Sequence, residues 1–333
     1  MEQPWQPGAT LEQLTQRARL KQLIHRFAAE QNWLEIDPPL LIDADPFELG
    51  IDLIETIDPL LHQPGCLHSS PELALKRVLA AYPELPGVYS LTPVFRAGES
   101  GQRHNPQFTL FEFYQTGGTF AEIITLTIRL VQKASTMLGT EPPQVVEYDY
   151  ADLFQQHCQL DVADVYLAPA ETLAQHAQAC GIHLACGEDL NRDDWLNLML
   201  THCIEPTFPN NQITVLQGFP ASQAAMAQTQ TEQIQGITVE RACRFEVYIG
   251  GMELANGYQE LRCASQQTQR IQAVQRDRPT LRTANQSIKR FTQALAHGLP
   301  ASCGVALGVE RLLMWLTQAE HIDQTIAFTH TRR

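Results

Sequence analysis

The spacing of apolar and polar positions predicts a first helix that begins near Thr10. Thr10 and Gln13 have the spacing of a capping box, in which each side chain accepts a hydrogen bond from the other residue's backbone amide. The apolar residues that follow recur on one side of a helix: Leu14, Ala18, Leu23, Phe27 and Ala28. We expect this helix to end before Pro38, because proline disfavours a helical residue in front of it.

Further helices are marked by their ends. The segment 70–82 has Pro71 where proline fits the first turn. Thr119 and Glu122 form a second capping-box pair, and the helix they open is expected to run to Gly139. We expect residues 43–67 to be irregular and residues from about 145 to 205 to form a mainly helical insertion. A last helix is expected from about 283 to 297, where Gly298 would end it.

Alternating polarity predicts strands at 88–96 and 107–115, joined by a Gly-containing bend, and another near 212–216. RFEVYI (244–249) alternates as well, and Gly250–Gly251 is a two-residue turn signal into a following strand. The chain closes with a strand, CGVALG, that enters a helix, VERLLMWLTQ. Antiparallel strands in hairpins with helices outside them predict an α+β fold rather than a doubly wound parallel sheet.

Composition narrows the class of protein. The 333-residue chain has a formal net charge of -14, which works against broad nucleic-acid binding because that binding neutralises phosphates. No apolar stretch approaches the ~20 residues of a membrane helix, and no signal peptide is evident, so we expect a cytoplasmic protein with no membrane partner. The eight cysteines include no C-x-x-C pair, which argues against zinc ribbons and favours free, mostly buried thiols.

Candidate chemistry gathers around the bend between the two central strands. Because side chains alternate along a strand, Glu112 and Tyr114 share one face of 107–115, and Phe111 and Phe113 the other. Taken alone, Glu112 is better explained as a structural carboxylate. The bend in front of it adds positive and polar groups that favour a binding site: Arg96, Arg103, His104 and Asn105. No G-x-G-x-x-G or Walker sequence is present to hold phosphates instead.

Four separated segments resemble one family in the right order. The segment FR…RHNPQFTLFEFY resembles motif 2 of class II aminoacyl-tRNA synthetases, and GVALGVERLLM (304–314) resembles motif 3. FPASQAAMAQ (219–228) and RFEVYIGGMELANGYQEL (244–261) are similar to the lysyl branch. The faintest match is motif 1, WLEIDPPLL, which places Pro39 near a family dimer interface. The resemblance therefore implies a class II synthetase-like catalytic core over 1–333, an antiparallel sheet flanked by helices, and a homodimer.

The resemblance also implies a nucleotide site for ATP. Arg96 would grip the α-phosphate, Phe108 would stack on adenine, and Arg311 would flank the nucleotide from the other side. Fixed positive charge suits this chemistry, because negative charge builds on phosphoryl oxygens in the transition state. The remaining residues that the resemblance assigns to ATP are Glu99, Arg103, His104, Asn105, Glu253, Leu254 and Gly308.

A pocket for a diamino acid and a magnesium site are implied beside it. Carboxylates would offset the lost hydration of the substrate's ammonium groups. The residues assigned to the amino acid are Ser70, Pro71, Glu72, Glu112, Tyr114, Asn256, Glu260 and Ala306. Glu253 and Glu260 would hold Mg²⁺, and both can face one site if the chain breaks between them, for which Asn256–Gly257 is the expected place.

Two positions depart from the lysyl pattern. Gly98 stands where an acid is usual, with Glu99 one residue later, and Gln107 replaces a glutamate. Both departures are compatible with altered substrate choice or weakened activity. They are the best support for one alternative, a catalytically silent protein that senses an adenylate or an amino acid.

Within the lysyl branch, the match is narrowest to the stand-alone paralogues that ligate lysine to elongation factor P. That match implies activation of lysine or (R)-β-lysine as an aminoacyl adenylate, followed by transfer to a lysine ε-amino group of elongation factor P. Ala306, a glycine in lysyl-tRNA synthetases, is expected to favour the β-amino acid. A tRNA-charging enzyme is the other alternative, but about 36 residues precede motif 1, so we expect no anticodon-binding domain and no tRNA partner.

Overall fold

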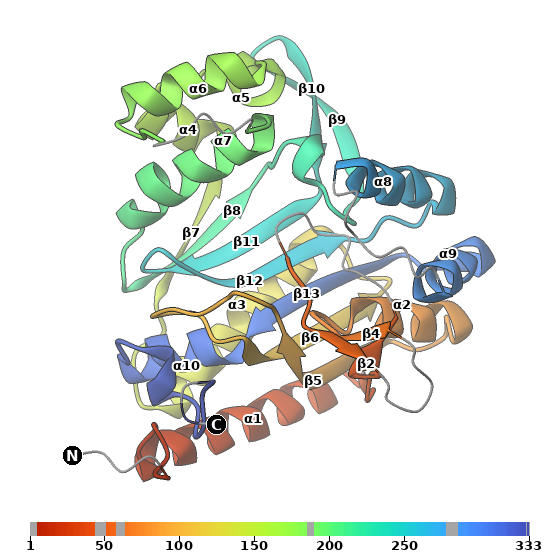
Figure 1. The fold of residues 1–333 in the computed structure, drawn as a ribbon, viewed down its shortest axis with the longest axis vertical. Coiled ribbons are helices and arrows are strands. Elements are labelled where there is room, and N and C mark those ends of the chain that lie inside the picture. Colours follow the sequence, from red (N-terminus) through yellow and green to blue (C-terminus); the bar gives the residue numbers. More distant parts are fainter. Residues whose placement is uncertain are drawn as a thin grey trace. The chain divides into compact units, whose positions relative to one another are not determined.

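The computed structural model of the chain describes residues 5–43, 51–57, 64–184, 190–277, 286–330 and 332. Its contacts divide into two compact units (Figure 1). The first unit is Met1–Pro142 together with Glu260–Arg333, and the second is Pro143–Gln259. Each contains β-strands with helices packed near them, so the predicted α+β class is confirmed.

In the first unit, four strands lie in the order β1-β5-β6-β13: Leu34–Glu35, Gly87–Phe95, Gln107–Thr116 and Ser302–Gly308. The pairs β5–β6 and β6–β13 are antiparallel, as predicted, whereas β1 runs parallel to β5. A separate three-stranded sheet has the order β2-β4-β3: Leu41–Ile42, Pro64–Leu67 and Glu55–Ile57. The expectation of irregular chain over 43–67 is therefore wrong for β3 and β4, and its residues 44–50 and 58–63 lie outside the described part.

The first unit also holds the helices α1 (Leu11–Glu30), α2 (Glu72–Ala81), α3 (Phe120–Met137), α8 (Ala264–Asp277), α9 (Gln286–Gly298), α10 (Val309–Thr317) and the short 3-10 turn η4 (Ile322–Gln324). Both predicted capping boxes are present, at Thr10 and at Thr119. Helices α3 and α10 pack near β13 and β6, and α1 packs on both helices. The predicted start of α9 at 283–285 lies outside the described residues.

The helix-facing side of β6 forms the core of the first unit. Phe111 and Phe113 are fully buried, and their ring centroids are 4.9 Å apart. Trp33 stacks on Phe113 at 4.7 Å. With these rings fixed on one face, the alternation of the strand turns Glu112 and Tyr114 to the other face.

A buried ion pair fixes helix α10 against the strand. Glu310, with 2% of its surface exposed, accepts hydrogen bonds from Arg17 Nη2 at 2.6 Å and from the backbone N–H of Thr109 at 2.8 Å. Arg17 also donates to Thr109 Oγ1 at 2.8 Å. Because Glu310 lies in the first turn of α10, this contact sets the position of Arg311 next to it.

In the second unit, four strands lie in the order β12-β11-β8-β7: Met252–Gln259, Arg244–Ile249, Gln212–Gln217 and Gln144–Asp149. The first three are antiparallel and β7 is parallel to β8. Gly250 and Gly251 form the predicted turn between β11 and β12, with φ values of 57° and 65°. The hairpin of β9 (Thr229–Ile234) and β10 (Ile237–Ala242) was not anticipated from the sequence, and neither was β7.

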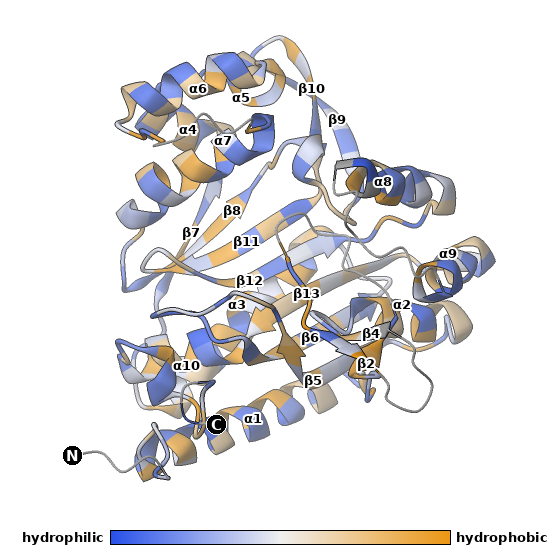
Figure 2. Cartoon of the chain, in the orientation of Figure 1, coloured by the Kyte–Doolittle hydropathy of each residue, from blue (hydrophilic) through white to orange (hydrophobic). Residues whose placement is uncertain are grey.

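After β7, the segment predicted as a helical insertion contains α4 (Tyr150–Cys158), α5 (Val162–Leu167), α6 (Ala170–Ala179), α7 (Arg192–Met199), a π-helical turn η1 (Leu200–Ile204) and a 3-10 turn η2 (Glu205–Thr207). A further 3-10 turn, η3 (Ala221–Gln223), follows β8. Within the core of this unit, Tyr150 stacks on Phe154 with ring centroids 4.5 Å apart, and Phe219 packs against Tyr150 at a tilt, with centroids 4.9 Å apart. Figure 2 shows both hydrophobic and hydrophilic residues on helices α4 to α7, as one-sided burial requires.

Within the described residues, no helix has both the length and the apolar character that crossing a membrane would take.

Candidate active site

The bend between β5 and β6 is a tight turn that carries the predicted cationic residues. Gly101 and His104 exchange backbone hydrogen bonds of 3.1 and 3.3 Å, and Arg103 between them is exposed. Arg96 lies where β5 ends, with its guanidinium carbon 5.2 Å from the ring centroid of Phe108. The structure therefore brings Arg96 and Phe108 together, as a phosphate grip beside an adenine platform would require.

Glu99 faces Arg96 across the start of the bend. The two side chains form an ion pair of 3.6 Å between Arg96 Nη1 and Glu99 Oε1, and each is about a quarter exposed. Gly98 between them has φ 76°. Although the acid comes one residue late in the sequence, the chain still turns it toward Arg96.

Arg311 reaches the bend from helix α10. Its Nη2 donates to His104 Nε2 at 2.7 Å. Gly308, the N-cap of this helix, pairs with Leu110 on β6 and has φ −76°, so it needs no glycine-specific conformation. Motif 2 and motif 3 therefore contact each other through the pair that the sequence assigned to the nucleotide.

The contacts of Asn105 favour a structural role, in which it supports the bend. It is 3% exposed, and its Nδ2 donates to the backbone carbonyl of Gln107. Its Oδ1 accepts from the backbone N–H of His330 at 3.2 Å and lies 3.0 Å from His330 Nδ1. Asn105 thus ties the bend to the C-terminal segment.

The other face of β6 carries a network centred on Glu112. Tyr114 donates its hydroxyl hydrogen to Glu112 Oε1 at 2.7 Å, and Ser70 Oγ donates to Glu112 Oε2 at 2.9 Å. The backbone N–H of Glu72 donates in turn to Ser70 Oγ at 3.0 Å. The structure therefore joins Ser70, Glu112 and Tyr114, as the sequence predicted.

Helix α2 adds a lysine that the sequence reasoning missed. Pro71 is the N-cap, one position before the predicted first-turn place, and α2 then presents Glu72 and Lys76 one turn apart. Lys76 Nζ binds Glu72 Oε1 at 2.6 Å and also binds Glu260, and it lies 5.7 Å from the Tyr114 ring centroid. The i,i+4 spacing of Glu72 and Lys76 was a signal that could have revealed this pair.

Three carboxylates and one ammonium thus form a buried cluster, which we call the carboxylate cluster: Glu72, Glu112, Glu260 and Lys76. Burial, with the negative charge of Glu72, raises the pKa of Glu112 to about 8 and that of Glu260 to about 7. Burial opposes the charge of Lys76, but Glu260 and Glu72 outweigh it and raise its pKa. With a pKa of about 8, Glu112 is mainly protonated at neutral pH when no other cation is near, and a cation placed beside it would favour its ionised form.

Strand β13 forms a boundary of this cluster. Gly304 lies opposite Tyr114, and a Cβ there would meet the Tyr114 ring at 2.3 Å and Glu260 Oε1 at 2.5 Å. Ala306 lies opposite Glu112, and directly opposed residues on antiparallel strands have Cβ atoms about 4.5–5.5 Å apart. The methyl group of Ala306 therefore sits beside the central carboxylate.

In the second unit, the strand of Glu253 has its irregularity at a different place from the predicted one. The register of β12 with β11 shifts between Glu253 and Ala255, which leaves Leu254 as an extra, buried residue. Asn256 and Gly257, the predicted break, pair regularly with β11. A bulge can reorient side chains without the unusual dihedrals that Asn-Gly was expected to provide.

The polar face of β11 holds further residues that the sequence reasoning did not assign. Glu246, buried and opposite Asn256, accepts hydrogen bonds from Tyr248 and Arg244. Burial raises the pKa of the Glu246 carboxyl. The positive charge of Arg244 opposes this shift, and the negative charge of Glu253 adds to it. Glu246 thus adds a second carboxylate near Glu253, and carboxylate oxygens are the kind of ligand that magnesium prefers. The alternation in RFEVYI was the signal for this face.

Asn256 is held by a hydrogen bond from its Nδ2 to the Tyr258 hydroxyl at 3.2 Å. Its Oδ1 is buried and, within the part of the chain that the structure describes, has no hydrogen-bond partner. A substrate donor would satisfy this oxygen.

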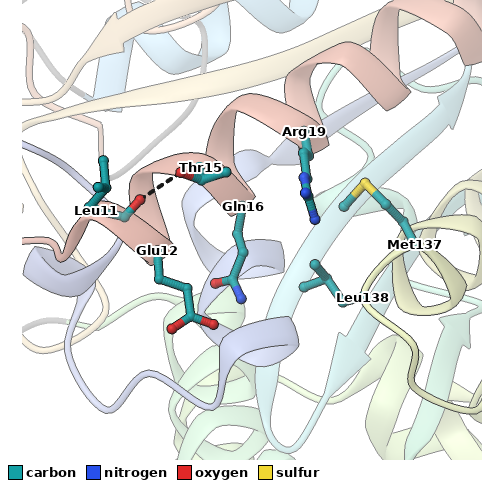
Figure 3. A pocket seen from close by; sticks show the side chains of 7 residues that line it. All are labelled: Leu11, Glu12, Thr15, Gln16, Arg19, Met137 and Leu138. Atoms are coloured by element: carbon teal, nitrogen blue, oxygen red, sulfur yellow. Dashed lines mark hydrogen bonds between the residues drawn. The ribbon is translucent and has the colours of Figure 1, made fainter.

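An open groove of about 510 Å³ lies elsewhere on the first unit, between α1 and the end of α3 (Figure 3). Its lining residues are Leu11, Glu12, Thr15, Gln16, Arg19, Met137 and Leu138. None of the predicted site residues lines it.

Comparison with known families decides which family this geometry represents. The family described as tRNA synthetases class II (D, K and N) matches residues 8–332. This chain belongs to the class II tRNA synthetases. The family resemblance of the four motifs is thereby confirmed, and the class II synthetase match spans both compact units.

Curated relatives narrow the similarity within this class II family. The chain is 34% identical over 333 residues to a protein of Histophilus somni named elongation factor P--(R)-beta-lysine ligase, covering 98% of each chain. Proteins with the same name in Haemophilus ducreyi and Salmonella heidelberg are 34% and 35% identical, covering 97% and 98% of this chain and 95% and 98% of their own. The chain is thus a class II synthetase-type enzyme of the ATP-dependent aminoacyl ligase class.

Proposed function

We propose that this protein activates lysine or (R)-β-lysine with ATP and transfers it to a lysine side chain of elongation factor P. The main support for an amino-acid substrate with an additional ammonium group is the position of Glu112. This carboxyl group is 2% exposed and is held by Ser70 and Tyr114. A buried carboxylate is stabilised when a cation joins it. A substrate ammonium is a cation of that kind.

The nucleotide side of the proposal rests on the bend. Arg96 beside Phe108, and Arg311 beside His104, are positive groups near flat rings in the same unit. We assign Arg96 to the α-phosphate and Phe108 to adenine. Fixed guanidinium groups would stabilise the charge that develops on the phosphoryl oxygens, without reorganising during the reaction.

The proposed reaction has two steps. In the first, a carboxylate oxygen of the amino acid attacks the α-phosphorus of ATP, and pyrophosphate leaves. In the second, an acceptor amine attacks the acyl carbon of the adenylate, and AMP leaves. Magnesium would neutralise phosphate charge in the first step, and Glu253 and Glu260 remain its predicted ligands.

The acceptor is inferred from the names of the relatives. Coverage of 98% of both chains supports the same acceptor class, a protein lysine rather than tRNA. The formal net charge of -14 agrees with that choice, because a tRNA acceptor is held largely through its phosphates.

We attribute the choice between the lysine isomers to Ala306. Its methyl group borders Glu112, so it would restrict the space where an α-amino group must lie. An amino group moved to the β-carbon would avoid that methyl group. Ala306→Gly should therefore lower the ratio of (R)-β-lysine to α-lysine activation, and an unchanged ratio would contradict the assignment.

The test is ATP–pyrophosphate exchange measured with α-lysine, with (R)-β-lysine and with no amino acid. We expect exchange that depends on a lysine isomer, and a loss of about 100-fold or more in Arg96→Ala, because such donors supply about 2.7–4 kcal/mol. Arg77→Ala, on the neighbouring helix α2, serves as a matched arginine control. Nucleotide binding without exchange would favour a sensing protein.

Acceptor choice needs a separate measurement. Purified elongation factor P and bulk tRNA are each incubated with the protein, ATP and radiolabelled lysine isomer. Label is expected on the protein and absent from tRNA; label on tRNA alone would overturn the proposed acceptor.

A further inference from the structure

Three cysteines that are far apart in the sequence meet in the second unit. The Sγ atoms of Cys158, Cys180 and Cys203 all lie within 4.8 Å of one another. We call these residues the cysteine cluster. They are free thiols, as the sequence predicted for all eight cysteines; of those, Cys186 lies outside the described residues.

Each thiol comes from a different helix end or turn. Cys158 is the last residue of α4, and Cys180 is the C-cap of α6. Cys203 lies in the π-helical turn η1 that continues α7, and Figure 1 shows α4, α6 and α7 in the same helical group. A π turn is uncommon and widens the helix, so the direction of Cys203 differs from that of a continued α-helix.

We propose that the cysteine cluster binds one thiophilic d10 metal ion, with zinc as the reference ion. Zinc–sulfur bonds of about 2.3 Å in tetrahedral geometry place two sulfurs about 3.8 Å apart, so each pair closes by about 1 Å or less. The fourth position is a water, for which the two half-buried members, Cys180 and Cys203, leave access. Thiolate ligands of this kind select soft ions over magnesium or calcium.

Electrostatics at two of the thiols favours a cation. Cys158 and Cys180 lie at helix C-termini, where backbone carbonyls carry partial negative charge. Binding breaks three S–H bonds, forms three metal–sulfur bonds and releases three protons to solvent, so affinity rises with pH.

All three members of the cysteine cluster belong to the second unit, Pro143–Gln259, whereas the carboxylate cluster belongs to the first. The metal would join α4, α6 and η1, three elements that also contribute to the hydrophobic core of this unit. Its role in this proposal is to hold the helical part of the second unit together. In this proposal the metal takes no part in the ligase reaction.

The experiment uses the full-length protein, reduced and free of purification tags. Zn²⁺ is titrated in competition with a chromophoric chelator, and Co²⁺ is added separately to read sulfur-to-metal charge-transfer absorption. We expect one ion per chain, charge-transfer bands, tighter binding at higher pH and a raised unfolding temperature with zinc.

Variants separate the cluster from other thiols. Cys203→Ser, at a half-buried position, should weaken zinc binding about tenfold or more while circular dichroism stays unchanged. Cys243→Ser changes a buried thiol of the same unit outside the cluster and should bind as the parent does. Absence of stoichiometric binding by the reduced parent, or equal loss in both variants, would overturn the proposal. So would a disulfide within the cluster in protein whose reduced form takes no metal.

Discussion

At the residue scale, the carboxylate cluster shows how one lysine reorganises a group of acids. Lys76 binds both Glu72 and Glu260, whereas Glu112 is held by the neutral donors Ser70 and Tyr114. Two acids therefore share an internal cation, whereas Glu112 holds a proton that a cation from outside would displace. Lys76 is buried, and a buried charge is tolerated only when opposite charges lie beside it, so Lys76 keeps both acids as partners.

Glu112 should make folding stability fall as the pH rises. Its folded-state pKa of about 8 lies above the usual 4.5, so the folded protein holds this proton more tightly than the unfolded chain. The resulting stabilisation is complete below 4.5 and is lost progressively up to about 8. Glu112→Gln, which remains neutral, should flatten this fall, which amounts to as much as about 5 kcal/mol at about 1.4 kcal/mol per pKa unit.

Chemical denaturation at a series of pH values provides that measurement. Glu122→Gln is the control, because the hydrogen bonds from Thr119 lower the pKa of Glu122 and place its titration below the window. An equal effect of the two variants between pH 4.5 and 8 would contradict the Glu112 assignment.

Gly304 is expected to tolerate no side chain. A Cβ would lie 2.3 Å from the Tyr114 ring and 2.5 Å from Glu260 Oε1, both of which are buried. Gly304→Ala should lower the free energy of unfolding by about 1–3 kcal/mol through overpacking, and should weaken amino-acid-dependent exchange more than ATP binding. Gly118→Ala is the control, because the atoms nearest to a Cβ there belong to the Gln115 side chain, at 3.0 to 3.3 Å, and Gly118 has no positive φ. A stable Gly304→Ala protein with unchanged exchange would argue against a crowded cluster.

At the element scale, local signals place the helices and long-range contacts orient them. The capping boxes at Thr10 and Thr119 begin α1 and α3 as the sequence predicts. The angle at which α10 meets β6 depends instead on Glu310, Arg17 and Thr109, three residues remote from one another in the chain. Arg311 is directed by that ion pair, which sequence spacing does not reveal.

The N-cap of α3 provides a prediction at this scale. Thr119→Ala removes the side-chain acceptor of the Glu122 amide and should lower the free energy of unfolding by about 1 kcal/mol. Thr125→Ala, in the middle of the same helix and exposed, should change it by less than about 0.5 kcal/mol. Urea melts of both variants give the comparison, and equal values would remove the cap from the account.

At the scale of the whole molecule, charge is the property that limits partners. The chain carries 23 Lys and Arg against 37 Asp and Glu, and its calculated isoelectric point is about 5.2. The positive groups near the bend are therefore local exceptions on an acidic protein. Such a surface suits a small nucleotide better than a long polyanion.

Bulk tRNA should accordingly fail to bind. At low salt, where non-specific affinity for nucleic acids is greatest, we expect no binding at low micromolar protein, against a usual range of about 10⁻⁴–10⁻⁶ M at physiological salt. Filter binding across a salt series is the measurement, with a basic RNA-binding protein as the positive control. Tight binding with a steep salt dependence would restore the tRNA-charging alternative.

The candidate site was predictable where residue type and local order carry the information. Ser70, Glu112 and Tyr114 meet because strand alternation and a helix start place them. Lys76 was missed although its spacing from Glu72 is visible in the sequence, because its second partner, Glu260, is remote in the chain and becomes a neighbour only in the fold. The irregularity in β12 was predicted at Asn256–Gly257, whereas it lies at Leu254. Conformational tolerance is visible in a sequence, but strand register is not.

The sequence by itself determined the helices with capping boxes, the central hairpin, the α+β class and the family, since each depends on short-range spacing or ordered motifs. Tertiary structure decided which charges pair, where β12 bulges and that three scattered cysteines meet. Those outcomes depend on burial and on contacts between distant segments. Their energies arise when water is excluded around groups that only folding brings together.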